Sequence, residues 1–356
     1  MASSQSPATK AGGPRLAAVE GGGTTWVVAI AVGQPDNIVE RAEFPTTTPD
    51  ETLGRCVDWL RQFEFDSIGV ASFGPVDLRP TSPTYGYITT TPKPGWQYVD
   101  VLSRFRSLRQ VPYAFDTDVN APALAEFARM QALARGLGGG APSSCCYITV
   151  GTGIGVGLVV NGAPVHGLMH PEGGHLAVPR RAVDLSFPGS NPKDCFGGSC
   201  AENMCCSLAL AKRAGLPSPA ALKELDDEHE VWHAAAHYIG AMCANIVLLA
   251  SPEKIVLSGG VMQRKSLFPR IRLALQAQLN GYIQMEQITS PSGIEEFLTS
   301  SHWGNNAGLV GALTLAEQAL LRSRSPPASP RVNVSTLVAS VVVSFAVGVA
   351  MATLRR

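Results

Sequence analysis

Glycine-rich turns at two places in the sequence could hold a phosphate group. Gly21 to Thr25 and Gly151 to Gly155 each join two apolar stretches that are typical of β-strands. Glycine lets the backbone approach a ligand closely and aim several N–H groups in one direction, an arrangement that binds phosphate oxygens. A hairpin also needs glycine for positive φ, so one such turn by itself predicts only a tight bend.

An aspartate lies where an open α/β sheet presents groups to a ligand. Asp118 follows a strand predicted over 111–115 and precedes a helix predicted over 122–136. The end of a strand beside the start of a helix is where such sheets expose ligand-binding side chains. Capping of the helix is the alternative role, although Asp116 fits it about as well and Asn120 fits it better.

The composition narrows the class of protein. Lysine plus arginine and aspartate plus glutamate each number 28, so the formal net charge is zero. A nucleic-acid partner bound through a broad basic surface is therefore not expected. The eight cysteines include the adjacent pairs 145–146 and 205–206, which argues against a disulfide framework and favours a reducing compartment.

Strands and helices alternate along two halves of the chain. In each half a strand, a glycine turn and a second strand are followed by further elements. The predicted strands are 16–20, 26–32, 67–72 and 111–115 in the first half and 147–150, 156–160 and 254–257 in the second. The predicted helices are 49–63, 99–107, 122–136, 202–214, 228–249, 267–279 and 305–321. This repeat predicts a duplicated α/β fold around a cleft.

The domain boundaries follow from the repeat. Residues 15–120 are expected to form an N-terminal α/β domain, which the helix over 305–321 completes. Residues 121–304 are expected to form a C-terminal α/β domain, and residues 1–14 a disordered leader.

The composition changes after the last predicted helix. Residues 322–331 read as a linker rich in serine, proline and arginine, and residues 332–354 then run without a charge. These 23 residues are enough to cross a hydrocarbon core of about 30 Å. A core helix would carry a polar face, whereas this segment has only Asn333 and scattered serines and threonines. The sequence predicts a C-terminal transmembrane helix.

Five motifs in the globular part occur in a recognisable order. They are EGGGTT at 20–25, FDTDVN at 115–120, TVGTGIG at 149–155, HPEGGH at 170–175 and LSGGV at 257–261. Together they resemble the sugar kinases of the ROK family. Stretches at 45–53, 72–96 and 117–126 are similar to its bacterial-type fructokinases. The resemblance covers about residues 16–321 and implies a duplicated actin/hexokinase-type (ribonuclease H-like) α/β fold, with two domains around a cleft.

The resemblance also implies roles for the aspartate and the glycine turns. Phosphoryl transfer to a sugar hydroxyl needs donors around the phosphates, a divalent metal and a carboxylate that accepts the hydroxyl proton. Asp118 is then the general base, with ATP and Mg²⁺ as cofactors. The implied ATP-binding residues belong to three glycine turns: Gly22, Gly23, Thr24, Gly151, Thr152, Gly153, Gly259 and Gly260.

Two positions near the first turn need separate interpretation. Thr25 stands where the family often has lysine, so a cationic contact is expected to be missing. Glu20 is shared with the fructokinase branch, and it either helps to position metal or phosphate or is only structural.

The His/Cys region over 166–202 is implied to bind the sugar and a structural zinc ion. In the family the residues matching Glu172 and His175 contact sugar hydroxyls, and the histidine also ligates zinc. Cys195 and Cys200 are the further implied zinc ligands.

Structural zinc takes four protein ligands, and lysine at position 193 leaves only three of the usual set. A fourth must come from Asp194, Cys205, Cys206 or water; otherwise the metal is lost and the cysteines are simply buried. The sequence assigns no role beyond packing to the remaining histidines considered, His166, His170 and His302.

The resemblance favours ATP-dependent phosphorylation of fructose, giving fructose 6-phosphate in preference to the C1 product. Glucose, mannose or an N-acetylhexosamine are competing acceptors, because Glu172 and His175 are common to much of the family. The long loop from Asp77 to Trp96 is expected to act as a lid over the cleft. A membrane-tethered, weakly active sugar sensor or scaffold is the alternative function. Family members are often dimers, which implies a homodimer here.

The predicted tail implies a location. A span that ends two residues before the C-terminus can insert only after synthesis, as a tail anchor that leaves the catalytic domains facing the cytosol. Its moderate hydrophobicity and basic flanks favour the mitochondrial or plastid outer membrane or the peroxisome over the endoplasmic reticulum.

Overall fold

The computed structural model describes residues 12–324. The predicted leader and linker lie mostly outside this range, and the predicted transmembrane segment over 332–354 lies wholly outside it.

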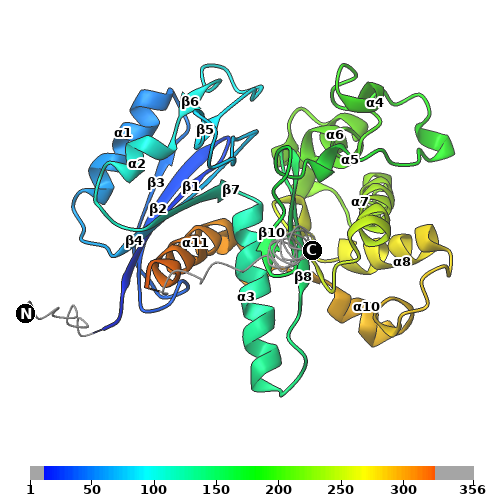
Figure 1. Cartoon of the computed structure of the whole chain (residues 1–356). Helices are drawn as coiled ribbons and strands as arrows, with labels where there is room; N and C mark the ends of the chain where they lie inside the picture. Colours follow the sequence, from blue (N-terminus) through cyan, green and yellow to red (C-terminus); the bar gives the residue numbers. More distant parts are fainter. Residues whose placement is uncertain (1–11, 325–356) are drawn as a thin grey trace, which may run out of the picture. The chain divides into compact units, whose positions relative to one another are not determined.

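The first half of the chain forms a five-stranded sheet in the order β3-β2-β1-β4-β7 (Figure 1). Strand β1 (Arg15–Gly21) pairs antiparallel with β2 (Thr25–Val32) and parallel with β4 (Ser67–Ser72). Strands β3 (Ile38–Pro45) and β7 (Tyr113–Thr117) form the two edges. The sequence did not predict β3, because its outward positions carry charged residues that an edge strand can leave in water.

The second half repeats this arrangement in the order β10-β9-β8-β11-β12. Strand β8 (Ser144–Val150) pairs antiparallel with β9 (Ile154–Val160) and parallel with β11 (Ile255–Ser258). The edge strands are β10 (Ala163–Pro164) and β12 (Leu298–Ser300). The two sheets have the same sequence of antiparallel and parallel neighbours, so the predicted duplication is confirmed.

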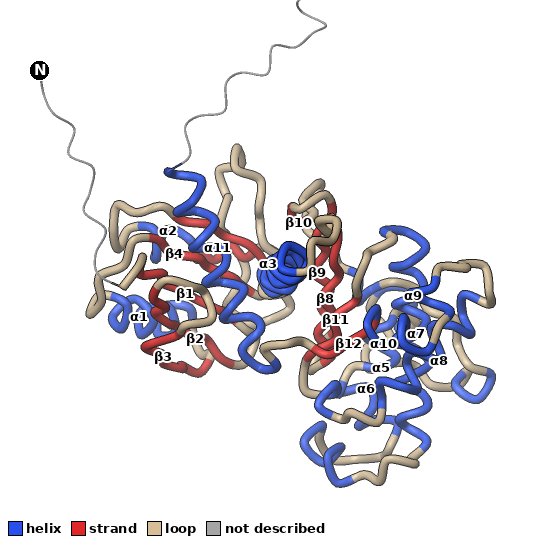
Figure 2. The backbone as a smooth tube through the Cα atoms, turned by 90° about the horizontal axis from the view of Figure 1, so that it is seen from below, coloured by secondary structure: helices blue, strands red, loops and turns tan. Residues whose placement is uncertain are grey.

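Two helices lie between the sheets: α3 (Asn120–Gly136) and α11 (Ala307–Arg324) (Figure 2). The strands alternate their side chains between two cores. In β1, Leu16 and Ala18 pack in the core with α3 and α11, whereas Ala17 and Val19 pack with the helices on the other face. Helix α11 thus packs in the core between the two sheets, and the predicted domain boundaries stay a prediction.

The remaining helices cover the outer faces of the sheets. On the first sheet these are α1 (Pro49–Leu60) and α2 (Leu102–Arg106). On the second they are α5 (Ala201–Cys205), α6 (Ser207–Arg213), α7 (Glu230–Ala250), α8 (Leu267–Leu279), α9 (Glu286–Thr289) and α10 (Pro291–Phe297). The short helix α4 (Cys195–Gly198) and the small hairpin of β5 (Tyr87–Ile88) and β6 (Val99–Asp100) lie in loops.

Two helix predictions need correction. The helix predicted over 202–214 is divided into α5 and α6, because Cys206 takes an extended conformation between them. The helix predicted over 99–107 is limited to α2, since residues 99–100 pair with β5 instead.

Among residues 12–324, α7 is the helix long and apolar enough to cross a membrane. However, 67% of its most apolar window is buried inside the protein, as expected for a core helix.

Candidate active site

The two glycine turns have the same construction. Residues 22–24 join β1 to β2, and residues 151–153 join β8 to β9. Within the described residues the N–H groups of Gly23, Thr24 and Thr152 have no intramolecular acceptor. Each turn therefore presents free backbone donors, which is what an anion-binding turn requires.

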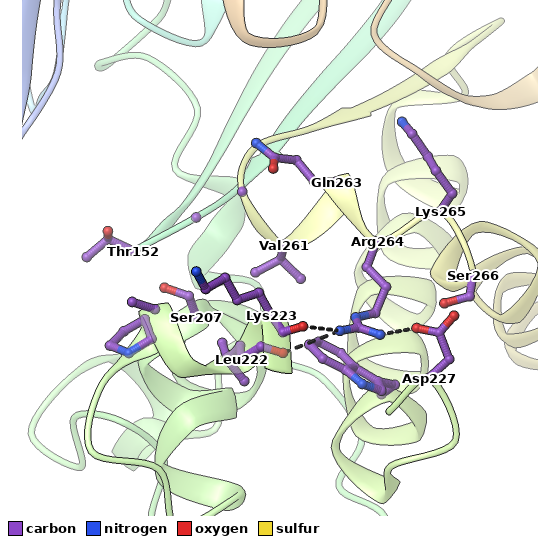
Figure 3. Close-up of a pocket in the computed structure, with 15 residues that line it drawn as sticks. Thr152, Ser207, Leu222, Lys223, Asp227, Val261, Gln263, Arg264, Lys265 and Ser266 are labelled. Atoms are coloured by element: carbon purple, nitrogen blue, oxygen red, sulfur yellow. Dashed lines mark hydrogen bonds and ion pairs between the residues drawn. The ribbon is translucent and has the colours of Figure 1, made fainter. Parts of the chain in front are cut away.

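A cavity of about 780 Å³ opens beside the second turn (Figure 3). Gly151, Thr152 and Gly260 line it together, so the structure brings the second and third predicted turns to one site. Gly259 precedes Gly260 at the end of β11 with a φ of 94°. The volume suits a ligand of nucleotide size.

The side chain of Arg264 lines this cavity and holds part of its wall in place. The Arg264 guanidinium lies 4.2 Å from the centre of the Trp232 ring and donates to the carbonyl of Leu225 at 2.9 Å. It also pairs with Asp227 (Figure 3). These contacts fix the short helical segment Pro219–Glu224, several residues of which line the cavity.

The first turn lines a separate cavity of about 420 Å³. Its walls include Gly22, Gly23 and Thr24 together with Glu20 and Arg41. The rims of the two cavities are joined by a contact of 3.4 Å between the side chains of residues 263 and 305.

Asp118 follows β7 directly, and its N–H donates to the carbonyl of Ser72 at 3.0 Å. The first turn of α3 is held instead by Thr117, whose hydroxyl accepts from the N–H of Asn120 at 2.9 Å. The buried Asp116 carboxylate accepts from the Asn120 side chain at 2.9 Å. The N-cap position of α3 is Val119, which makes no side-chain capping bond, so Asp118 is not the cap.

Three acidic side chains cluster around this position. Burial raises the pKa of Asp118 to about 7, and the negative charge of Glu172 adds to the rise. Burial also raises the pKa of Glu20 to about 8, with Asp118 adding to it. Burial raises the pKa of Glu172 as well, and Glu202 opposes its ionisation, while His170 and His175 favour it. Carboxylates that repel one another in a partly buried site are typical of groups that bind a cation or move a proton.

Glycines allow the two halves of this site to meet. A Cβ at Gly157 would lie 2.0 Å from the carbonyl oxygen of Val119, so only glycine lets β9 accept the segment after Asp118. A Cβ at Gly174 would lie 2.0 Å from the carbonyl oxygen of Ile154. The glycine pair in the HPEGGH motif therefore seats the loop of Glu172 and His175 directly on β9.

The predicted metal region has a different centre from the one expected. His175 Nδ1 lies 3.6 Å from Cys200 Sγ and 3.5 Å from Asp194 Oδ2, and the three ligand atoms lie within 4.8 Å of one another. Two ligands of a tetrahedral zinc ion are about 3.3–3.8 Å apart, and both distances from His175 Nδ1 lie in this range. Cys195 is exposed and is not part of the group, because Phe196 and Gly197 turn the chain through left-handed conformations.

Two histidines that the sequence analysis left without a role have specific partners. His166 Nε2 lies 2.9 Å from Asp116 Oδ2, and His170 Nε2 accepts from the N–H of Val76 at 3.1 Å. His166 also lines a cavity of about 500 Å³ beside the predicted lid. No spacing in the sequence indicates these contacts, because each joins segments far apart in the chain.

Comparison with known proteins gives consistent matches over the globular part. A family model described as the ROK family matches residues 16–319. The chain is 40% identical to a putative fructokinase of Bacillus subtilis (strain 168) over 306 residues, which cover 86% of this chain and 96% of that protein. It is 36% identical to a fructokinase of Pediococcus pentosaceus over 305 residues, 86% of this chain and 98% of that protein.

Solved structures share the fold at lower identity. A ROK hexokinase from Thermus thermophilus has a TM-score of 0.63 at 22% identity, with 86% of this chain and 99% of that chain covered. A ROK family glucokinase from Streptomyces griseus, in complex with glucose and AMPPNP, has a TM-score of 0.63 at 19% identity, with 85% and 99% covered. The two-domain α/β fold of the actin/hexokinase type, predicted from the sequence, is confirmed.

Proposed function

Because this chain belongs to the ROK family, we propose that it transfers the γ-phosphoryl group of ATP to a hydroxyl of a hexose, with fructose as the acceptor and fructose 6-phosphate as the product. The named fructokinases among its relatives are matched over nearly their whole length, which supports both the reaction and the sugar.

One observation carries the proposal: the carboxylates of Asp118 and Glu172, from opposite halves of the chain, are near enough to repel each other, and Asp118 likewise acts on Glu20, which lines the cavity of the first glycine turn. Asp118 is the group that accepts the proton of the attacking hydroxyl. A raised pKa suits this role, because a base titrating near neutral pH combines an available carboxylate with a useful affinity for the proton. Glu172 and His175 orient the sugar through its other hydroxyls.

The cavity lined by Gly151, Thr152 and Gly260 takes the nucleotide, with Gly259 shaping that turn. The free N–H groups of the turns over 22–24 and 151–153 hold its phosphates. Glu20, which lines the cavity of the first turn, fits a magnesium ion, because Mg²⁺ prefers carboxylate oxygens. Bound there, Mg²⁺ supplies positive charge to the phosphates.

Zinc is proposed as a structural ion held by His175, Asp194 and Cys200, the donor set whose spacing fits it. Asp194 thus replaces Cys195 in the set of ligands inferred from the sequence. An ion at this place would fix the His175 ring close to the sugar-binding Glu172.

The tail supports a proposal of its own. Residues 332–354, uncharged and bordered by arginines, anchor the protein post-translationally in an organelle membrane, with the kinase facing the cytosol. A homodimer is proposed on the resemblance to the family alone. A sensor or scaffold without activity is not favoured, since it would need neither Asp118 nor the phosphate turns.

The proposed reaction is tested by a coupled assay of ADP release with ATP, Mg²⁺ and a panel of fructose, glucose, mannose and N-acetylhexosamines. We expect the highest kcat/KM with fructose. A protein that releases no ADP in a sugar-dependent manner would contradict the proposed function, and a higher kcat/KM for another sugar would contradict the choice of fructose.

A further inference from the structure

A lysine of the predicted lid contacts the first phosphate turn. Lys93 Nζ donates to the carbonyl oxygen of Gly23 at 2.6 Å, although 70 residues separate them in the chain. Arg41 is a cationic residue lining the cavity of this turn, and its guanidinium pairs with Glu43. Lys93 therefore brings a positive charge to the turn, whereas the charge of Arg41 on the neighbouring strand is already paired.

The bond fixes the direction of a donor. The carbonyl of Gly23 and the N–H of Thr24 belong to one peptide unit, and in a trans peptide these two groups point in opposite directions. Holding the carbonyl on Lys93 therefore directs the N–H of Thr24 to the other side of the turn. Gly23 and Thr24 both line the cavity there, and within residues 12–324 this N–H has no acceptor of its own.

Other peptide groups of the two turns are also held by hydrogen bonds to their carbonyls, but the donors are a short side chain or the backbone. The Thr46 hydroxyl donates to the carbonyl of Gly22 at 2.8 Å. In the second turn the N–H of Ser207 donates to the carbonyl of Gly151 at 2.8 Å, which directs the N–H of Thr152 away from it. Only the Gly23–Thr24 peptide depends on a long side chain, and glycine at 23 leaves that peptide free to rotate without it.

The lid keeps the lysine in place through a buried tryptophan. Trp96 is fully buried, stacks on Trp26 with ring centres 5.4 Å apart, and donates from its indole to the carbonyl of Thr47 at 2.9 Å. The backbone N–H of Trp96 donates to the carbonyl of Lys93 at 3.2 Å. Trp26 lies opposite Gly21 in the hairpin, so lid and turn share one rigid support.

We propose that Lys93 is a positioning residue for phosphoryl transfer, which holds the Gly23–Thr24 peptide with its N–H toward a phosphate of the bound nucleoside triphosphate. The charged hydrogen bond also polarises the peptide and strengthens the N–H as a donor. This inference rests on the proposed function. Thr25 supplies no positive charge to the turn, and Lys93 of the lid supplies it instead.

The test compares Lys93→Met and Lys93→Arg in the full chain. Lys93→Met should lower kcat/KM for ATP by roughly ten- to hundredfold, the effect expected for one hydrogen bond to a charged group. The KM for fructose and the affinity for AMP should stay within about twofold, since neither involves the β- and γ-phosphates. Lys93→Arg should recover most of the loss, because it keeps a cationic donor.

A matched control is available in Lys212, whose Nζ donates to the carbonyl of Gly189 at 2.8 Å, a residue that belongs to neither glycine turn. Lys212→Met should leave kcat/KM for ATP unchanged. An unchanged kcat/KM for ATP in Lys93→Met, or a loss seen equally for fructose and AMP, would overturn the inference while the kinase function stands. If the parental protein shows no kinase activity, the proposed function fails. The role of the lysine is then decided by binding alone: Lys93→Met should lose affinity for ATP but not for AMP.

Discussion

Asp118 and Glu172 come from opposite halves of the chain and share one acidic site. Burial raises the pKa of Asp118 to about 7, and the Glu172 carboxylate adds to that rise. A general base acts only when deprotonated, so its active fraction grows as the pH rises through its pKa.

We therefore expect kcat/KM for fructose to rise with pH, with a midpoint at about pH 7, because this ratio reports the pKa of the free enzyme. Glu172→Gln removes one of the negative charges that oppose ionisation of Asp118, so the midpoint should move to lower pH. The measurement is a pH profile of kcat/KM for fructose for both proteins. A midpoint that does not move, or one that moves to higher pH, would contradict the coupling.

Asp118→Asn should lower kcat by roughly 10²–10⁴-fold, the range for losing a general base, with little change in ATP affinity. The same variant should unfold at higher temperature than the parent at pH 8. A carboxyl whose pKa is raised by folding binds more protons when folded, so its stability contribution, present at acid pH, is lost as pH rises toward 7. Removing the buried charge should add on the order of 1–3 kcal/mol at pH 8. Near-parental turnover in a folded variant would show that Asp118 is not the base.

Arg264→Met should weaken ATP binding without changing the KM for fructose. The guanidinium packs on Trp232 and holds the carbonyl of Leu225, so its loss releases the wall of the larger cavity. We expect the KM for ATP to rise by roughly tenfold, the cost of losing hydrogen bonds to a charged donor. Arg104→Met is the control, because Arg104 makes an exposed ion pair with Asp50. Parallel increases in the KM for ATP and fructose would point to general loss of structure instead.

The purified protein should contain about one zinc ion per chain by elemental analysis. Cys200→Ala should remove the metal and lower the melting temperature, because Cys200 Sγ belongs to the compact donor group. Cys195→Ala is the matched comparison and should keep the metal, since Cys195 is exposed and outside that group. Equal loss in both variants would restore Cys195 as a ligand, and active parental protein without zinc would exclude the site.

Residues 322–356 fused behind a fluorescent protein should reach an organelle surface and resist carbonate extraction. The physical reason is the uncharged stretch over 332–354, which is long enough to span a bilayer. The control is the same fusion with Val343→Arg, which places a charge within the stretch and should remain in the cytosol. A diffuse signal from the parental tail would exclude an anchor. In a separate experiment, removing residues 326–356 from the full chain should leave kinase activity unchanged.

The local parts of this molecule follow from the sequence. The hairpins over β1–β2 and β8–β9 are predictable because apolar strands flank short glycine turns. The position of Asp118, between the end of β7 and the start of α3, is predictable for a similar local reason. Contacts between distant segments are not predictable in this way. The bonds from Lys93 to Gly23 and from His166 to Asp116 depend on how loops return to the sheet.

The metal region shows a second kind of limit. The Cys195-x4-Cys200 spacing suggests two equivalent thiol ligands, but spacing does not reveal backbone direction. Phe196 and Gly197 have φ values of 54° and 60°, which reverse the chain and leave Cys195 exposed while Asp194 faces His175. The spacing of the two cysteines therefore does not predict which side chains lie near His175.

The position of α11 has a consequence for how the protein is made. This helix supplies Leu309, Leu313 and Ala316 to the core behind the first sheet, yet it is the last described element of the chain. During synthesis the first sheet emerges early, but the part of its apolar face that α11 covers stays open until almost the whole globular part has left the ribosome. Domains usually fold in the order in which they are translated. Here the N-terminal domain is finished last, so the nascent chain should need chaperone protection over most of its translation.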